Sequence, residues 1–401
     1  TGSNAFMPLS AIICATAPSA DSPDLPRAQL HFVGQNVMEY QARQARDAGI
    51  GHVIILVDAV TPALSLSVDR LNADGVQVQL IRDMATLVRD VPRETDLLLF
   101  SDGALVDQQY VLKLAQVGGS NLLVTEDGPT TAHLERIDGV HRWCGLARIT
   151  PDILFGTLDL IGDWDFALTL LRAAVQSNAR RITLPASDYF DGHAAMIDRQ
   201  ATADLVAQNL LRPNVESQSA DAGAEHYVLR PLVNMLSARF VRMQTPSIQL
   251  RLGAVALGLA GLLMLYPAWS VLAILFFLAA LTGNLVADRL STLARRDYAD
   301  GWIGLAPVAL VLSGMVIFGA QHGNWDSALY LACLCGVIHL AIRWKRGYAM
   351  EKWAYLTPGT ALLMLLLGII TGHAPLLVQM ATLLSIGSLA RLVLRDRRRS
   401  Q

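Results

Sequence analysis

The hydrophobic and polar positions of this chain follow two different patterns, and the change falls at Thr245-Pro246. Before that point, short apolar runs alternate with charged, helix-like stretches. After it, long apolar runs are separated by short polar turns, at residues 252–269, 271–287, 301–320, 328–342, 353–372 and 374–390. Each run is close to the length that a helix needs to cross a bilayer, the fourth being short. The pattern predicts an α/β globular domain followed by an all-α domain of six membrane-spanning helices.

The turns between the apolar runs alternate in charge. Lys and Arg residues follow the second, fourth and sixth runs, whereas the turns at residues 266–267, 321–326 and 372–375 contain none. Because positive side chains stay on the cytoplasmic side, we expect both termini and the whole N-terminal region to be cytoplasmic, in a bacterial-type inner membrane. Buried helices of a globular protein are the alternative, which this alternation disfavours.

The amino-acid composition is consistent with one soluble half and one membrane half. The chain is 53% hydrophobic with a mean hydropathy of +0.38, as expected when a membrane half and a soluble half are averaged. A net charge of -2 argues against a nucleic-acid partner. The four cysteines are scattered, which indicates neither a disulfide framework nor a zinc site. We expect residues 1–6 to be a cloning remnant, and the short apolar stretch that follows lacks the features of a signal peptide.

The N-terminal half alternates β-branched runs with helical stretches. Strands are predicted at residues 11–13, 52–57, 76–81, 96–101, 121–125, 145–149 and 181–184. Helices are predicted at residues 37–48, 63–73, 108–117, 166–178 and 201–211. This alternation predicts a doubly wound α/β domain with a parallel sheet over residues 7–212. Such sheets bind ligands at the carboxyl ends of their strands, which directs attention to the loops after Ile13 and Ser101.

Four segments of this half carry a resemblance to a known family. They lie at residues 25–30, 33–41, 47–50 and 98–102 and read LPRAQL, VGQNVMEYQ, DAGI and LLFSD. Their order and spacing resemble those of the sugar-phosphate nucleotidyltransferases. The resemblance places Arg27 at the family's lysine position and implies that Asp102 and Asp198 hold Mg²⁺ against a nucleotide. It therefore makes Arg27, Asp102 and Asp198 the candidate nucleotide-binding residues, and the two aspartates the candidate metal ligands.

The phosphate-binding loop of that family departs from its pattern here. Residues 15–24 contain no glycine, two prolines and two aspartates. A glycine-rich loop is needed because backbone N–H groups must approach a triphosphate closely, and proline has no N–H to offer. Nucleotidyl transfer is therefore disfavoured. Because Gly103 follows Asp102, an aspartate in a turn is the alternative to a metal ligand.

The second half resembles another family. After a linker at residues 213–226, residues 227–244 have the spacing of an amphipathic helix on the cytoplasmic leaflet. Thr245-Pro246-Ser247 then resembles the Thr-Pro-Asn that opens the first span of CDP-alcohol phosphotransferases. With six spans over residues 245–401, the chain is similar to the fused members of that family, in which a nucleotidyltransferase-like domain precedes the phosphotransferase.

The family's aspartate signature, DxxDGxxAR followed by GxxxDxxxD, is missing. Its aspartates bind the divalent metal that offsets repulsion between the reacting groups. Anchoring on Asp300-Gly301-Trp302 aligns the four aspartate positions with Gly283, Val286, Gly304 and Val308. The resemblance therefore predicts a catalytically degenerate protein. It would act by binding a nucleotide or a CDP-linked lipid, as a homodimer or as a partner of an active family member.

Charged residues near the ends of the spans are the remaining candidates. Arg251, Asp288, Arg289 and Arg343 suit a phosphate or anionic headgroup. The alternative is that they only set topology and make solvated ion pairs. An active phosphotransferase with its acids displaced to Asp288, Asp297 and Asp300 stays open as an alternative function. A transporter is disfavoured because the spans are uniformly apolar. Glycines of the spans, Gly304 and Gly314 among them, are predicted to be helix-packing positions.

Overall fold

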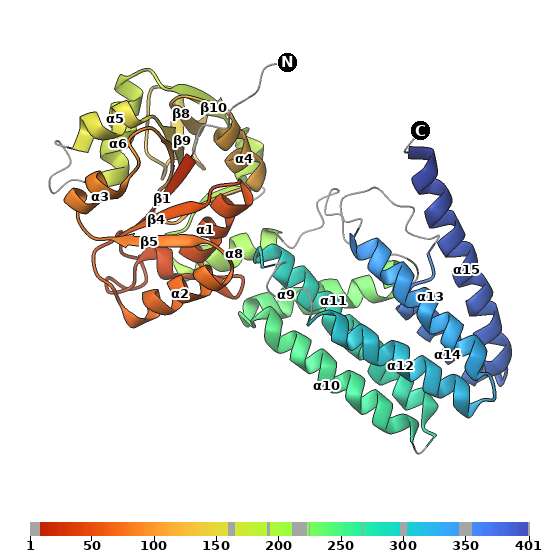
Figure 1. Cartoon of the computed structure of the whole chain (residues 1–401). Helices are drawn as coiled ribbons and strands as arrows, with labels where there is room; N and C mark the ends of the chain where they lie inside the picture. Colours follow the sequence, from red (N-terminus) through yellow and green to blue (C-terminus); the bar gives the residue numbers. More distant parts are fainter. Residues whose placement is uncertain are drawn as a thin grey trace. The chain divides into compact units, whose positions relative to one another are not determined.

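The computed structural model describes residues 9–158, 165–190, 193–210, 223, 225–266, 268–296, 303–344 and 355–399. The chain divides into two compact units, Thr1–Arg212 and Pro213–Gln401. We call them the α/β unit and the helical unit (Figure 1). The residues expected to be a cloning remnant, most of the linker predicted at 213–226, and Asp297 and Asp300 lie outside the described residues.

The α/β unit is built on one seven-stranded sheet with the order β10-β8-β9-β6-β1-β4-β5. Its strands are β1 (Leu9–Ala15), β4 (His52–Val57), β5 (Gln77–Ile81), β6 (Asp96–Phe100), β8 (Asn121–Glu126), β9 (His141–Ile149) and β10 (Arg180–Thr183). All seven strand predictions correspond to these elements. The prediction of a parallel sheet was wrong for β9, which runs antiparallel to β6 and β8. No helix connects β8 to β9, and a parallel pair requires a crossover connection.

Helices cover both faces of this sheet (Figure 1). They are α1 (Val37–Asp47), α2 (Pro62–Ala73), α3 (Met84–Asp90), α4 (Gln108–Gln116), α5 (Pro151–Leu158), α6 (Phe166–Gln176) and α7 (Ala186–Phe190). The last helix of the unit, α8 (Gln200–Leu210), packs against the short strand β2 (His31–Phe32) instead. One core packs Met38 and Val111 against one face, and a second packs Leu87 and Leu170 against the other. Burial on both faces explains why the strands read as continuous apolar runs. The short α3, α5 and α7 were not predicted, since five to eight residues show little helical periodicity.

Two short strand pairs and a 3₁₀ turn shape one edge of the sheet. β7 (Ala104–Val106) pairs with β11 (Ala194–Met196), and β2 (His31–Phe32) pairs with β3 (Gln35–Asn36). The 3₁₀ turn η1 (Arg27–Gln29) follows the loop after β1. The β7–β11 pair aligns the chain after Asp102 with the chain before Asp198.

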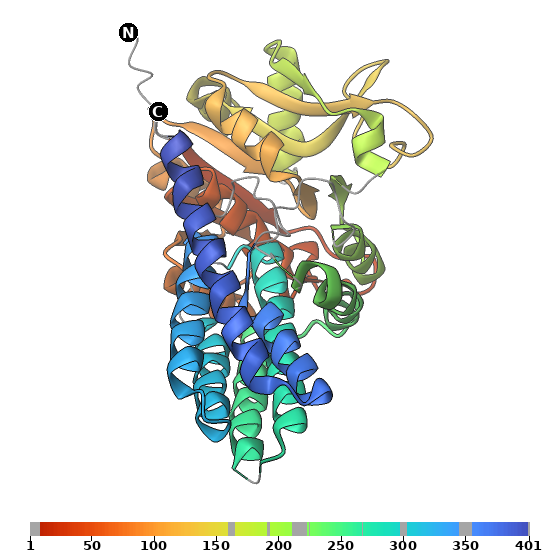
Figure 2. The same ribbon diagram turned by 90° about the vertical axis from the view of Figure 1, so that its right-hand side faces the viewer.

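The helical unit contains α9 (Arg230–Arg242), after a π-helical turn at Glu225–Leu229, and six further helices. These are α10 (Ser247–Leu265), α11 (Ser270–Leu293), α12 (Leu305–Gln321), α13 (Trp325–Trp344), α14 (Pro358–Thr371) and α15 (Ala374–Arg399). They run side by side in Figures 1 and 2. Among the described residues, four helices are long and apolar enough to cross a membrane, namely α10, α11, α13 and α15.

Of the six predicted spans, four are thus long enough among the described residues. α12 and α14 have 17 and 14 residues and are shorter than the predicted third and fifth runs. α14 begins late because Thr357 caps it and Pro358 occupies its first turn, which fixes the start of a helix. The fourth span, expected to be short, is the 20-residue α13. This helix continues past the apolar run to include the charged Arg343, so the apolar pattern alone does not mark its end.

Small residues allow the helices to pack closely around Phe277 of α11. A Cβ atom added to Gly261 or to Gly314 would overlap the Phe277 ring. The helix-packing role predicted for Gly314 is therefore correct. Successive helices alternate in direction along the bundle (Figure 1), so α10, α12 and α14 begin at one end, where α11, α13 and α15 finish. We call this the basic end, and the opposite end the turn end.

Candidate functional site

Asp102 of the α/β unit lies at the carboxyl end of β6 and holds the loop that follows β1. Its carboxylate accepts hydrogen bonds from the Ala17 backbone N–H at 3.1 Å and from the Thr16 hydroxyl at 3.4 Å. The side chain is buried, and burial raises its pKa to about 6, with a further rise from nearby Asp165. The loop donors act in the opposite direction. Asp102 thus engages the Thr16 hydroxyl and the Ala17 N–H of this loop.

The rest of this loop also binds its own chain. Ser19 N donates to Leu25 O at 2.8 Å, and Arg27 N donates to Ala17 O at 2.9 Å. Ser22 N donates to the Ser19 hydroxyl at 3.1 Å. In a glycine-rich loop such N–H groups point at the ligand. Here they close the loop on itself.

Arg27 and Asp198 lie on the same edge but have partners of their own. The Arg27 Nε donates to Pro18 O at 3.0 Å. Asp198 forms an ion pair with Arg199 at 2.9 Å and accepts from the Thr202 hydroxyl at 3.2 Å. The hydrogen bond from Arg199 lowers the pKa of Asp198. The structure therefore brings the three predicted residues to one edge without joining their side chains.

A magnesium ion fits this edge poorly. Both candidate carboxylates already accept hydrogen bonds from this chain, and Asp198 is paired with a cation. No group of three or more His, Cys, Asp or Glu residues that could hold a metal ion occurs within the described part of the chain. Gly103 serves the turn instead, because its φ is +71° and a Cβ there would overlap Ile197 O. The turn interpretation of Asp102-Gly103 is the one that this geometry favours.

In the helical unit, three of the four predicted headgroup residues meet at the basic end. The guanidinium of Arg251 lies 2.9 Å from one carboxylate oxygen of Asp288, and that of Arg343 lies 3.7 Å from the other. They come from the start of α10, the last turns of α11 and the end of α13. Arg251 is only 2% exposed. We call these three residues the arginine cluster.

Gly304 completes the cluster by leaving space for it. A Cβ atom added to Gly304 would overlap the Nη1 atom of Arg251 and would lie 3.5 Å from Nη1 of Arg343. The Gly304 carbonyl accepts a hydrogen bond from Asn284 of α11 at 3.1 Å. The predicted helix-packing role of Gly304 is therefore borne out, with a guanidinium of α10 as the group that approaches it. Only the helix arrangement puts residues 251, 284 and 304 together.

Arg289, the fourth predicted residue, has a different partner. Its Nη1 donates to the Asn234 side chain, and this bond joins α11 to α9. The amphipathic character predicted for residues 227–244 is visible in α9, where Val233 and Val241 are buried while Arg239 and Arg242 are exposed. Arg289 therefore belongs to the α9–α11 contact.

Comparisons with known proteins give limited similarity. No family model matches the sequence, and no curated protein matches it. Among solved structures, the inositol-1-phosphate CTP transferase from T. maritima is similar, with a TM-score of 0.38 and 15% identity over 51% of this chain and 96% of that chain. A putative glucose-1-phosphate thymidylyltransferase from Bacillus anthracis, in complex with a sucrose, has a TM-score of 0.40 and 11% identity over the same shares. Likeness at this level assigns no activity, and the helical unit has no counterpart in these two matches.

Proposed function

We propose that this protein is a membrane-integrated binding protein for a phosphate ester, either a CDP-linked molecule or an anionic lipid headgroup, and that it performs no phosphotransfer. The observation that carries the proposal is the buried arginine cluster at the basic end of the helical unit. Arg251 is 2% exposed, lies among apolar helices and is held 2.9 Å from Asp288.

A buried arginine suits this role for chemical reasons. A guanidinium is always charged and presents donors in a planar fork that matches the oxygens of a phosphate. Arg251 lies in the second turn of α10, and Arg343 is the penultimate residue of α13, so both are about one turn from the basic end. A headgroup at the membrane surface can reach that depth.

The surroundings of Gly304 support binding without catalysis. In the resemblance to CDP-alcohol phosphotransferases, Gly304 takes the place of a metal-binding aspartate. The atoms of Arg251 fill the space into which a side chain at position 304 would extend. By this resemblance, the Arg251 guanidinium would take the place of the family's metal ion. Asp288 lies between two guanidinium groups, which disfavours it as a metal ligand or a base.

The ends of the bundle support the membrane orientation that we propose. Exposed aromatic residues gather at the turn end, where Tyr266, Trp269 and Trp325 are 95%, 59% and 55% exposed. Tyr and Trp favour the membrane–water interface, and arginines favour the cytoplasmic side. The proposal therefore places the basic end in the cytoplasm of a bacterial-type cell. A homodimer, or pairing with an active enzyme of the same kind, is part of the proposal.

Ligand titration of the full-length protein in nanodiscs tests the proposal. CDP-glycerol, CDP-diacylglycerol and phosphatidylglycerol are the probes, and their comparison separates a nucleotide ligand from a lipid headgroup. We expect saturable binding of at least one probe, weakened tenfold or more by Arg251→Met and by Arg343→Met. Arg251→Lys keeps the charge but loses the planar fork, so it should give intermediate affinity. Arg239→Met, an exposed arginine of α9, is the control and should bind as the wild type does.

Two results would contradict the proposal. Binding of all three probes that is unaffected by Arg251→Met and Arg343→Met would remove the arginine cluster as the site. Magnesium-dependent release of CMP from a CDP-alcohol, stopped by Asp288→Asn, would establish the active phosphotransferase with displaced acids instead.

A further inference from the structure

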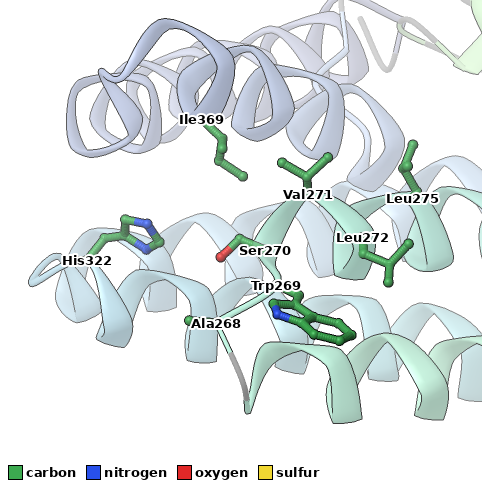
Figure 3. Close-up of a pocket in the computed structure, with 8 residues that line it drawn as sticks. All are labelled: Ala268, Trp269, Ser270, Val271, Leu272, Leu275, His322 and Ile369. Carbon is green, nitrogen blue, oxygen red and sulfur yellow. The ribbon is translucent and has the colours of Figure 1, made fainter.

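A cavity of about 490 Å³ lies at the turn end of the helical unit, far along the helices from the arginine cluster (Figure 3). Its apolar wall includes Val271 and Leu275 of α11 and Ile369 of α14. Two polar side chains, Ser270 and His322, complete the lining. None of the eight lining residues carries a formal charge at neutral pH when His322 is neutral. Volume and lining are typical of a site for a small, mostly apolar molecule.

His322 is fixed in one orientation before any ligand arrives. Its Nδ1 lies 2.8 Å from the carbonyl oxygen of Phe318, and its ring contacts the Phe318 ring at a tilt of 31°, with centroids 4.2 Å apart. A carbonyl oxygen can only accept, so Nδ1 carries the proton of the neutral ring. Nε2 is then the acceptor atom. The cavity is therefore supplied with a preorganised hydrogen-bond acceptor.

The turn between α10 and α11 holds the other polar group. Ala268 has a φ of +60°, which is unusual for a residue other than glycine and costs on the order of 1 kcal/mol. Ser270 N donates to Ala268 O at 2.9 Å, and Trp269 N donates to Met264 O at 3.1 Å. The Ser270 side chain points to the side of the cavity on which His322 lies (Figure 3). This strained turn therefore places the Ser270 hydroxyl on the same side of the cavity as the His322 acceptor (Figure 3).

The cavity opens on the outer surface of the bundle, which determines the kind of molecule that can enter it. Trp269, Leu272 and Leu275 line it and are 59%, 39% and 48% exposed, so it opens on the outside of the bundle. Trp269 is one of its lining residues, and exposed Tyr266 and Trp325 lie at the same end of the bundle, as at a membrane–water interface. This step rests on the membrane placement proposed above, in which the surroundings of the bundle are lipid.

We propose that this cavity binds an uncharged lipid alcohol of the diacylglycerol type. The hydroxyl of the ligand would donate to His322 Nε2 and accept from the Ser270 hydroxyl, while its chains lie along Val271, Leu275 and Ile369. An anionic phospholipid is excluded as the preferred ligand because the lining offers its phosphate no cation. Water alone is disfavoured because most of the lining is apolar.

Quenching of tryptophan emission in the full-length protein tests this site. Protein in nanodiscs is titrated with a diacylglycerol brominated in its chains, and in parallel with its methyl ether, which lacks the hydroxyl donor. We expect saturable quenching by the alcohol, a part of which disappears in Trp269→Phe. The methyl ether should bind at least tenfold more weakly.

Histidine variants separate the acceptor from a general effect on the bundle. His322→Leu should weaken binding of the brominated alcohol tenfold or more. His322→Gln supplies an acceptor oxygen and should retain most of the affinity. His373→Leu is the matched control, because His373 lies at the same end but bonds Thr371 O and does not line the cavity. Arg251→Met should leave this binding unchanged, which separates this site from the proposed phosphate site.

Two results would overturn the site. Equal quenching by the brominated alcohol, its methyl ether and a brominated phosphatidylcholine would mean that only surrounding bilayer lipid reaches Trp269. If no brominated lipid quenched any tryptophan, the membrane placement itself would fail, and this site with it.

Discussion

At the scale of single residues, the most consequential feature is an arginine that fills the space beside a glycine. The free-energy cost of burying a guanidinium is large unless it is paired, and Asp288 supplies a partner for Arg251 at 2.9 Å. Gly304 contributes by having no side chain. Stability and ligand binding at the basic end therefore depend on the same few atoms.

Gly304→Ala should disturb both properties. The added methyl group would overlap Arg251 Nη1, so the guanidinium must move away from Asp288 or the helices must separate. We expect the free energy of unfolding to fall by about 1–3 kcal/mol, together with weaker binding of the phosphate probes. Thermal and denaturant unfolding in detergent would measure the loss.

Gly253→Ala is the matched control for this substitution. Gly253 lies in α10 near Arg251 and is exposed, and a Cβ there would meet nothing within 4 Å. Alanine favours a helix over glycine by up to about 1 kcal/mol, so this variant should be as stable as the wild type or slightly more stable. If both variants behaved alike, the space beside Gly304 would not be critical.

At the scale of elements, the loop after β1 shows how one side chain closes a segment. Asp102 accepts from Thr16 and Ala17, and backbone bonds within residues 17–27 complete the closure. The buried carboxyl is held there with a pKa of about 6. Because this carboxyl is buried, the free energy of folding of the α/β unit depends on whether it is charged, and therefore on pH.

The sign of this pH dependence follows from the raised pKa. The ordinary value of an aspartate in the unfolded chain is about 3.9, so between about pH 4 and 6 the folded state binds more protons than the unfolded state. Stability from this group is therefore lost as pH rises through that window. Above pH 6 the charged, buried Asp102 destabilises the α/β unit by roughly 2–3 kcal/mol.

Asp102→Asn should remove this pH dependence. The amide oxygen can still accept from Ala17 N–H, so we expect the variant to be more stable than the wild type at pH 7, by on the order of 2 kcal/mol, and equal to it near pH 4. Hydrogen exchange of the β1 and β6 amides in the full-length protein, converted to a free energy of opening, measures the stability of the two proteins at pH 7 and at pH 4. Asp58→Asn, an exposed aspartate after β4, is the control. A wild-type profile that is flat from pH 4 to 7 would contradict the expectation.

Element prediction from the sequence worked where the patterns were long. All seven strands of the large sheet and five of its helices were recognisable, because burial on both faces and amphipathic spacing leave clear signals. The direction of β9 was missed, since a strand has the same apolar pattern in either direction. α14 was predicted too long because its capping residue Thr357 and Pro358 lie inside an apolar run.

At the scale of the whole molecule, the two proposed binding sites lie at opposite ends of the helical bundle. The arginine cluster lies at the basic end, whereas the cavity with His322 lies at the turn end. If the helices cross a bilayer, the two proposed sites face opposite leaflets.

Cysteine labelling in cells tests this arrangement. A membrane-impermeant thiol reagent applied to intact spheroplasts should label Gln321→Cys at the turn end and leave Arg391→Cys, near the C-terminal end of α15, unlabelled until the cells are lysed. Cys333→Ser is the background for both, because Cys333 is exposed whereas Cys14, Cys144 and Cys335 are buried. Labelling of Arg391→Cys before lysis would reverse the proposed orientation.

The sequence by itself determined the division into an α/β part and a strongly apolar helical part, most elements, and the absence of a glycine-rich loop after β1 and of an aspartate signature in the helices. These features depend on periodicity and residue type along the chain. It could also indicate Arg251, Asp288 and Arg343 as unusual charges near apolar runs.

Only the tertiary structure decided which of these residues meet. Arg251 and Gly304 are separated by 53 positions along the chain, and Gly304 and Arg343 by 39, so their contact depends on the order and length of the helices. Packing between distant segments also brings the Asp102 carboxylate to the loop after β1. It likewise brings His322 and Ile369 to one cavity. Local patterns fix where a helix or strand forms, whereas packing between distant segments fixes which side chains come together.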